Sequence, residues 1–128
     1  MQDKHLFEYA VIRVVPRVER EEFMNVGVIL LCSKQKFLKM VYHIDRERLQ
    51  AFAKDLDIQA LEENLLSFQR IATGGADAGP IGELDAASRF RWLTATRSTV
   101  VQTSKVHPGF CGNGDDTILR LYNQLVLQ

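Results

Sequence analysis

The first forty residues alternate between apolar runs and short polar breaks, a pattern that predicts three strands. Residues 7–15 are rich in β-branched and aromatic side chains and end at Pro16, as expected for a strand. The near-continuous apolar run MNVGVILLCS predicts a central strand that is covered on both faces. FLKMVYH predicts a third strand, and the short connections favour antiparallel neighbours. The N-terminal third is therefore expected to form a three-stranded meander.

Apolar residues repeat at helical spacing in the middle of the chain. Asp45 and Asp57 are suitable N-caps for two amphipathic helices that should pack on the sheet. The second helix should end at the TGG sequence, because a glycine there can adopt the left-handed conformation that closes a helix. A shorter helix is expected from Glu83 to about Thr94.

The remaining segments predict a loop, a strand and a last helix. The Gly, Ala and Pro content of TGGADAGPIG indicates a flexible loop near residues 73–82. STVVQTS predicts a fourth strand, HPGFCGNGDD a loop, and Asp115 or Asp116 the cap of the last helix. The expected class is α+β: a mainly antiparallel sheet of about four strands, made of the N-terminal meander and the late strand, with helices packed on it.

Length, composition and charge limit the classes of protein to which this chain can belong. A chain of 128 residues, 46% hydrophobic and 25% charged, fits one globular domain spanning residues 1–128. Its 16 basic and 16 acidic residues cancel, which argues against strong nonspecific binding to nucleic acid or to acidic membranes. No signal peptide or membrane span is visible. Cys32 and Cys111 are therefore expected to be reduced thiols of a cytoplasmic protein, with Cys32 a small core residue.

Arg13 is the only charged residue in the strand pattern YAVIRVVP, and two interpretations compete. Its aliphatic stem could lie on the sheet while its head reaches solvent or a structural carboxylate. Alternatively, the guanidinium could point into a cleft and hold an anion, for which its forked donors are suited. The second strand adds Asn25, which can recognise amides or cap turns, and Gly27. A glycine among β-branched residues often marks a bulge, or a close approach by another backbone or a ligand.

The late strand carries a second group of polar side chains. Strand alternation places Ser98, Gln102 and Ser104 on one face and Arg97 on the other. His107 follows in the expected loop, where functional histidines are often found. A strand face with so few large apolar groups is typical of an exposed edge or of the floor of a polar site.

His107 and Glu21 are the candidates for acid–base catalysis. Glu21 lies in a charged loop, where carboxylates are usually solvated, and a catalytic triad is defined by geometry rather than by sequence. His5 and His43 have no ligand-like spacing to His107, so no metal site is expected, and no cofactor is expected either. The TGG sequence lacks the strand, lysine and helix of a phosphate-binding loop.

Two stretches together resemble a known family. FEYAVIRVVPRVEREEFMNVGVILLC and RFRWLTATRSTVVQTSKVHPG are similar to a bacterial family catalogued only as domain of unknown function DUF3037. The likeness covers nearly the whole chain and skips TGGADAGPIG. Lys105 departs from the small residue or proline expected before His107. The pattern falls on Arg13, Pro16, Glu21, Phe23, Asn25, Gly27, Arg97, Ser98, Gln102, Ser104 and His107.

The resemblance implies a cytoplasmic bacterial protein with no established activity. It also implies an accessory role beside a partner protein, a kinase of the persistence-toxin type. These are expectations from the family and not from the composition or spacing of the residues.

Pairing of the late strand with the first would bring the polar groups together. The side chains expected to converge are Arg13, Asn25, Arg97, Gln102 and His107. Such a site suits a phosphate, a carboxylate or a peptide backbone.

The small size and neutral charge favour a binding module for a partner protein or an anionic ligand. One alternative is an enzyme acting on a phosphorylated or nucleotide substrate, with His107 or Glu21 as acid–base group. Another is a purely structural role for Arg13.

Overall fold

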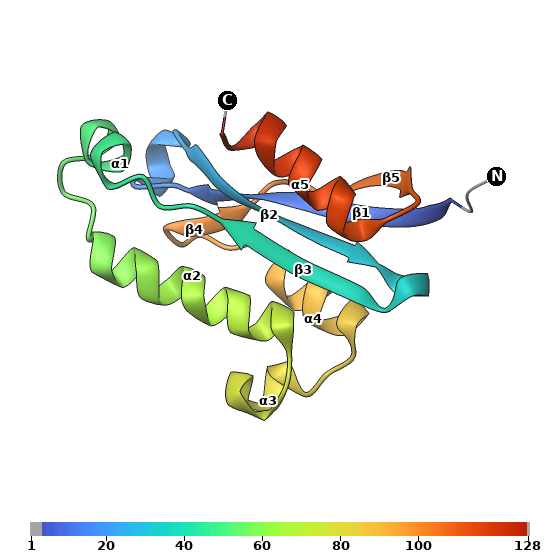
Figure 1. Cartoon of the computed structure of the whole chain (residues 1–128). Helices are drawn as coiled ribbons and strands as arrows, with labels where there is room; N and C mark the ends of the chain where they lie inside the picture. The colour runs from blue at the N-terminus through green and yellow to red at the C-terminus, as the bar shows by residue number, and fades with distance from the viewer. Residues whose placement is uncertain (1–3, 128) are drawn as a thin grey trace.

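A computed structural model describes residues 4–127 of the protein. These residues form one five-stranded sheet with helices on both faces (Figure 1). The strands are β1 (His5–Val14), β2 (Met24–Cys32), β3 (Phe37–Tyr42), β4 (Val101–Thr103) and β5 (His107–Cys111). The sheet order is β3-β2-β1-β4, and β5 also pairs with β1. All pairs are antiparallel. The expected α+β class, with an N-terminal meander and a late strand beside β1, is confirmed.

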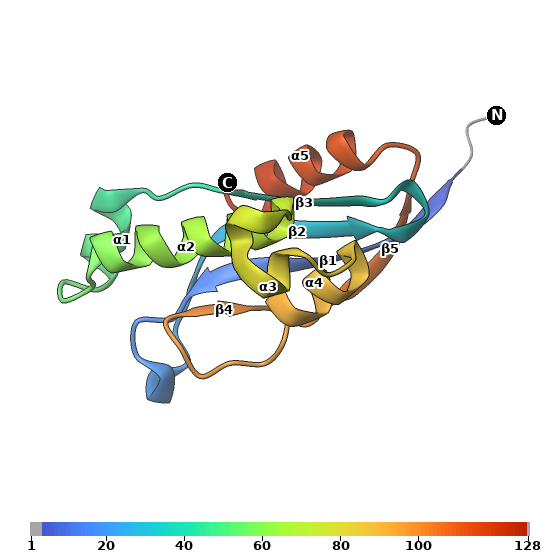
Figure 2. The same ribbon diagram turned by 90° about the horizontal axis from the view of Figure 1, so that it is seen from below.

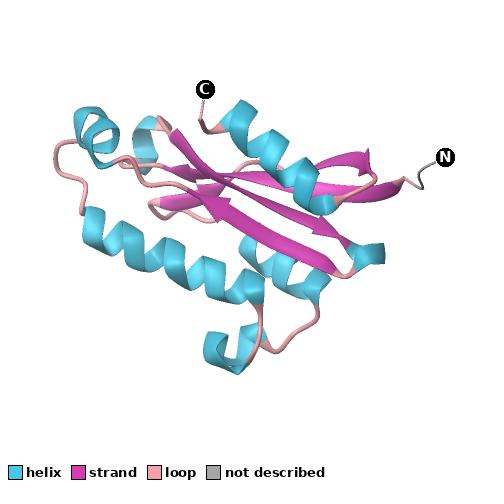
Figure 3. Ribbon diagram, viewed as in Figure 1, coloured by secondary structure: helices cyan, strands magenta, loops and turns pink. Residues whose placement is uncertain are grey.

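The helices form two layers (Figure 3). On one face lie α2 (Ile58–Thr73), α3 (Gly79–Gly82) and α4 (Ala86–Leu93), and on the other lies α5 (Gly114–Leu125). The short helix α1 (Arg46–Phe52) precedes α2 near one end of the sheet. Single 3-10 turns occur at η1 (Val18–Arg20), η2 (Ser33–Gln35) and η3 (Ala76–Ala78). Within residues 4–127, no helix is long and apolar enough to cross a membrane.

Strand alternation divides the core into two clusters. Ala10, Ile12 and Val14 of β1 point toward α2 and α4, whereas Phe7 points toward α5. β2 contributes to both clusters, so the prediction of a strand covered on both faces is confirmed. Cys32 and Cys111 are buried free thiols in the cluster beneath α5. Burial is the main cause that raises the pKa of the Cys111 thiol.

Helix ends follow local side-chain chemistry. Asp45 and Asp57 cap α1 and α2, each accepting a hydrogen bond of 3.1 Å from a backbone N–H in the first turn. α2 ends at Gly74, which has a φ of 84°. The last helix differs from the prediction, because Asn113 rather than Asp115 or Asp116 is its N-cap. The helix starts earlier than expected, which places both aspartates inside its first turn, where they complement the helix dipole.

The predicted loop HPGFCGNGDD is wrong in its first half, because residues 107–111 form β5. The strand pairs with His5–Tyr9 at the sheet edge, where a proline can replace an N–H donor that faces solvent. Gly109 suits this position because an added Cβ would lie 2.5 Å from the Phe7 ring. The expected strand over STVVQTS is confirmed only as the three-residue β4, since the residues before it form a turn.

Two short helical segments, η3 and α3, occupy the predicted loop near residues 73–82. The segment is closed by a hydrogen bond of 2.9 Å from the Gly75 N–H to the Gly82 carbonyl oxygen. Its flexibility stays a prediction.

Replacing Gly27 with alanine is expected to lower the free energy of unfolding by about 2 kcal/mol, because crowding a well-packed site typically costs about 1–3 kcal/mol. An added Cβ would lie 2.6 Å from the Val41 carbonyl oxygen and 2.8 Å from the Tyr42 Cβ on β3. Denaturant unfolding followed by the fluorescence of the single tryptophan, Trp92, measures this change. An unchanged midpoint and slope would contradict the close approach of β3.

Candidate functional site

A β-bulge in β2 brings Asn25 beside Arg13. Ile12 is paired with Gly27, but the next residue of β1, Arg13, is paired with Asn25. Val26 is therefore the extra residue, and it packs into the core beneath the sheet. The bulge turns Asn25 toward the opposite face, on the side of α5. The expectation that Gly27 marks a bulge or a close backbone approach is thus confirmed on both counts.

β4 completes a row of three polar side chains. Arg13 is paired with Gln102 on its other side, and paired residues of an antiparallel sheet point to the same face. Asn25, Arg13 and Gln102 therefore lie side by side across β2, β1 and β4, and we call them the arginine row. All three are half-buried. Of the five side chains expected to converge, Arg13, Asn25 and Gln102 are neighbours in the sheet register.

The arginine row begins beside the end of α5, where Asn25 contacts Leu125, and runs away from this helix toward β4. α5 packs on β2 and β3, and Figures 1 and 2 together show it on the β3 side of the sheet. On the same face, Phe7 and Val11 of β1 are buried, whereas Tyr9, Arg13 and Gln102 are half-buried and His107 is exposed; we call the surface that these last four residues form the open face. Tyr9 lies on it, four residues from Arg13 along β1, or about 13 Å at the usual strand rise.

Arg13 lies beneath an aromatic ring and has no acidic partner among the described residues. Its Cζ is 3.9 Å from the centre of the Phe23 ring, which is a cation–π contact. Its Nε is buried and makes no hydrogen bond. No carboxylate within residues 4–127 forms an ion pair with it. The structural carboxylate of the first interpretation is therefore not found among the described residues. Burial lowers the pKa of the Arg13 guanidinium from its ordinary value, and an arginine nevertheless stays charged.

Asn25 has one satisfied and one unsatisfied polar atom. Its Nδ2 donates a hydrogen bond of 3.1 Å to the carbonyl oxygen of Leu125, near the end of α5. Its Oδ1 is buried and has no partner. The row thus contains an unpaired buried donor on Arg13 and an unpaired buried acceptor on Asn25. Such atoms are uncommon in folded proteins and costly to leave unpaired.

His107 lies on the open face but apart from the arginine row. It begins β5, is paired with Tyr9, and its ring centre is 5.3 Å from that of Tyr9. The imidazole is exposed. Tyr9 was not singled out by sequence, although its alternation with Arg13 along β1 already placed both on one face. Phe23 belonged to the family pattern, but nothing in the sequence indicated that its ring stacks on Arg13.

Arg97 does not join this site, so the prediction that Arg13 and Arg97 converge is wrong. Its guanidinium lies on the opposite face, 5.0 Å from the Phe68 ring centre and 4.7 Å from that of Trp92. It donates hydrogen bonds to three carbonyl oxygens at the end of α4, those of Trp92, Leu93 and Ala95. The residues between α4 and β4 lie on the α4 side of the sheet, so Arg97 is beside the end of α4. Burial lowers its pKa from the ordinary value.

The other predicted site residues have separate positions. Ser104 is buried and joins β4 to β1: its Oγ accepts a hydrogen bond of 2.8 Å from the Val11 N–H, where the ladder passes from β4 to β5. Ser98 is exposed in the turn before β4. Glu21 is exposed beyond the end of β1 and has a left-handed backbone with a φ of 57°. Glu21 therefore lies far along β1 from His107, which is paired near the middle of that strand.

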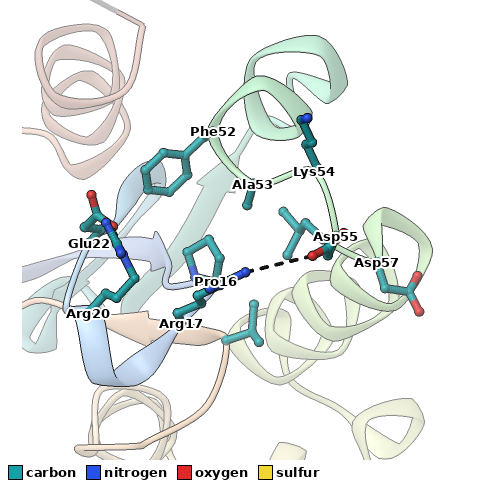
Figure 4. Close-up of a pocket in the computed structure, with 11 residues that line it drawn as sticks. Pro16, Arg17, Arg20, Glu22, Phe52, Ala53, Lys54, Asp55 and Asp57 are labelled. Carbon is teal, nitrogen blue, oxygen red and sulfur yellow. Dashed lines mark hydrogen bonds and ion pairs between the residues drawn. The ribbon is translucent and has the colours of Figure 1, made fainter.

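A cleft of about 680 Å³ lies apart from the arginine row (Figure 4). Its walls are the β1–β2 connection and the segment from Phe52 to Asp57, which joins α1 to α2. Arg17 and Asp55 face each other across it, with an Nη2–Oδ2 distance of 3.9 Å. In residues 4–127 no three His, Cys, Asp or Glu side chains gather closely enough to hold a metal ion.

Comparison with known proteins gives one match. The family model described as protein of unknown function (DUF3037) matches residues 9–126. No curated protein and no solved structure matches the chain.

Proposed function

Because the chain belongs to the DUF3037 family of proteins of unknown function, we propose its role from the geometry. The protein is a small binding module that holds an anionic group, a carboxylate or a phosphate, at Arg13 on the open face. One observation carries this proposal: Arg13 has a buried, unpaired Nε and no acidic partner among the described residues.

The chemistry of Arg13 suits an anion. A guanidinium presents donors in a fork that matches carboxylate and phosphate oxygens. Phe23 and the strands remove part of its water, which strengthens its interaction with an opposite charge. A half-buried arginine with no counter-charge would otherwise cost stability. Gln102 adds a polar side chain on the β4 side of the row.

The ligand that we propose is a group on a partner protein. The open face is a sheet surface on which Phe23, 45% exposed, and the exposed His107 are available for contact. Aromatic and arginine side chains are enriched where proteins bind one another. An acidic or phosphorylated side chain of the partner would reach Arg13. The kinase partner implied by the family resemblance belongs to this proposal.

We expect Arg13→Gln to weaken anion binding about tenfold or more, because hydrogen bonds to charged groups are worth about 1.5–3 kcal/mol. Two peptides serve as probes, hexaglutamate and a phosphoserine peptide of the same length. Each is titrated into ¹⁵N-labelled protein, and the backbone amide shifts are recorded. In the wild-type protein the shifts should centre on Arg13, Asn25 and Gln102. The peptide that binds with the lower Kd shows whether the site prefers a carboxylate or a phosphate.

Arg120→Gln is the matched control, because Arg120 is exposed on α5 and its loss changes the net charge equally. Arg120→Gln should bind as the wild type does. Equal weakening by both variants, or shifts that avoid the arginine row, would overturn the proposal. The purely structural role predicts instead that Arg13→Gln lowers the unfolding midpoint and leaves binding unchanged.

A further inference from the structure

The cleft beside Arg17 has the features of a second binding site, separate from the open face. We propose that it binds a small amphipathic anion, with an apolar body about the size of a ring system and a single carboxylate, phosphate or sulfonate group. This inference does not depend on the proposed function, because the cleft and the arginine row share no residue.

The size and lining of the cleft suit the apolar part of such a ligand. Its volume of about 680 Å³ falls within the range of about 300–1,000 Å³ that small-molecule sites occupy. Phe52 and Val100, 36% and 37% exposed, leave apolar surface facing the hollow. Figure 4 shows the Phe52 ring on the α1 side and Pro16 on the β1 side. The apolar lining residues are Pro16, Phe52, Ala53, Leu56 and Val100.

The acidic side chains of the cleft are largely engaged. Asp57 caps α2 and accepts a hydrogen bond from the Ala60 N–H. Glu22 is hydrogen-bonded to Arg20, and this contact is the main cause that lowers the pKa of the Glu22 carboxyl. A cationic ligand would therefore have to compete with existing partners for both of these carboxylates.

The basic side chains are more available. The Arg17–Asp55 pair is long, at 3.9 Å, and its side chains are 64% and 94% exposed. Exposed ion pairs of this kind contribute little to stability, so a ligand anion can replace Asp55 at Arg17. Lys54 also lines the cleft and forms no ion pair with a carboxylate in residues 4–127. Of the three basic and three acidic side chains of the cleft, Arg17 and Lys54 are thus the cations that an anionic ligand can reach.

Two fluorescent probes test the inference because they differ by one charged group. They are 1-anilinonaphthalene-8-sulfonate and N-phenyl-1-naphthylamine, which has the same rings without the sulfonate. The sulfonate probe should bind with one-to-one saturation and about fivefold or more tightly than the neutral probe, as expected for one charge-assisted contact. Phe52→Ala should weaken both probes. Phe110→Ala is the control, since Phe110 is 70% exposed on β5 and lies outside the cleft.

Charge variants separate the anion contact from ring burial. Arg17→Gln should abolish the preference for the sulfonate probe and leave the neutral probe unaffected. Asp55→Asn should tighten the sulfonate probe several-fold, because it releases Arg17. The four substituted side chains, Arg17, Phe52, Asp55 and Phe110, are exposed, and unchanged thermal unfolding confirms that each variant is folded.

Any one of four results would overturn the inference. The first three are equal losses from Phe52→Ala and Phe110→Ala, no change of preference with Arg17→Gln, and saturation at several probes per chain. Loss of the sulfonate probe from Arg13→Gln would also overturn it, because the probe would then bind on the open face. That last result would leave the proposed function standing, so the two proposals fail separately.

Discussion

Replacing Arg97 with alanine is expected to lower the free energy of unfolding by about 3 kcal/mol. The guanidinium donates to three carbonyl oxygens at the end of α4, at 2.6 Å, 2.8 Å and 3.2 Å. It also makes cation–π contacts with the rings of Phe68 and Trp92. A positive charge at a helix C-terminus is favourable for the helix dipole. Alanine removes all of these contacts at once.

Denaturant unfolding measures the Arg97 effect. Circular dichroism is the signal, because the substitution changes the surroundings of Trp92 and therefore its fluorescence. Arg97→Lys should recover only part of the loss, since an ammonium lacks the planar fork that reaches three carbonyls. Arg120→Ala on the exposed face of α5 is the control and should change stability little. A stable Arg97→Ala variant with weakened anion binding at the open face would contradict the structural role and restore Arg97 to the binding site.

Replacing Arg89 with alanine is expected to destabilise the protein by a similar amount, about 3 kcal/mol, and to loosen the segment between α2 and α4. Its Nη1 donates to the carbonyl oxygens of Ile71 and Ala72 at the end of α2, at 3.0 Å and 2.6 Å. Its Nε donates to Leu84, at 2.9 Å. One side chain on α4 thus closes the end of α2 and fixes the returning chain.

Hydrogen exchange locates the Arg89 effect. Amides of residues 73–85 should exchange faster in Arg89→Ala than in the wild-type protein, while those of β1 and β2 keep their relative protection. The same measurement on the wild type tests the flexibility predicted for residues 73–82. Uniform loss of protection across the chain would show instead that Arg89 stabilises only the fold as a whole.

The elements that could be predicted from sequence are those whose cause is local. Period-two alternation defines β1, and the aspartates before α1 and α2 cap their helices directly. β5 was missed because Pro108 and Gly109 resemble turn residues. Their strand conformation depends on pairing with β1, about a hundred residues earlier in the chain. The cap of α5 was missed because three nearby residues, Asn113, Asp115 and Asp116, all suit that position by type.

The candidate site was predictable only in part, for the same reason. Arg13 and Gln102 were singled out because polar residues interrupt strand patterns, and the pairing of β4 with β1 brings them together. Their relation to Asn25 depends on the bulge at Val26. Gly27 indicates a bulge or a close backbone approach, but the sequence does not show which neighbouring residue is the extra one. Arg97, like Arg13, is an arginine in a segment with a strand pattern. Only the path of the chain between α4 and β4 shows that its side chain caps a helix.

β1 pairs with β2, which follows it closely, and with β4 and β5 near the end of the chain, and this arrangement has a consequence for folding during synthesis. The second side of β1 is completed only by β4 and β5, and the hydrogen bond between Val11 and Ser104 spans 93 residues. Contacts so distant in sequence slow folding. During synthesis β2, β3 and the helices up to α4 emerge before β4 and β5. Until then β1 is a long apolar strand with one unpaired edge, a surface on which partly made chains associate. Completion of residues 101–111 is therefore the step that removes this edge.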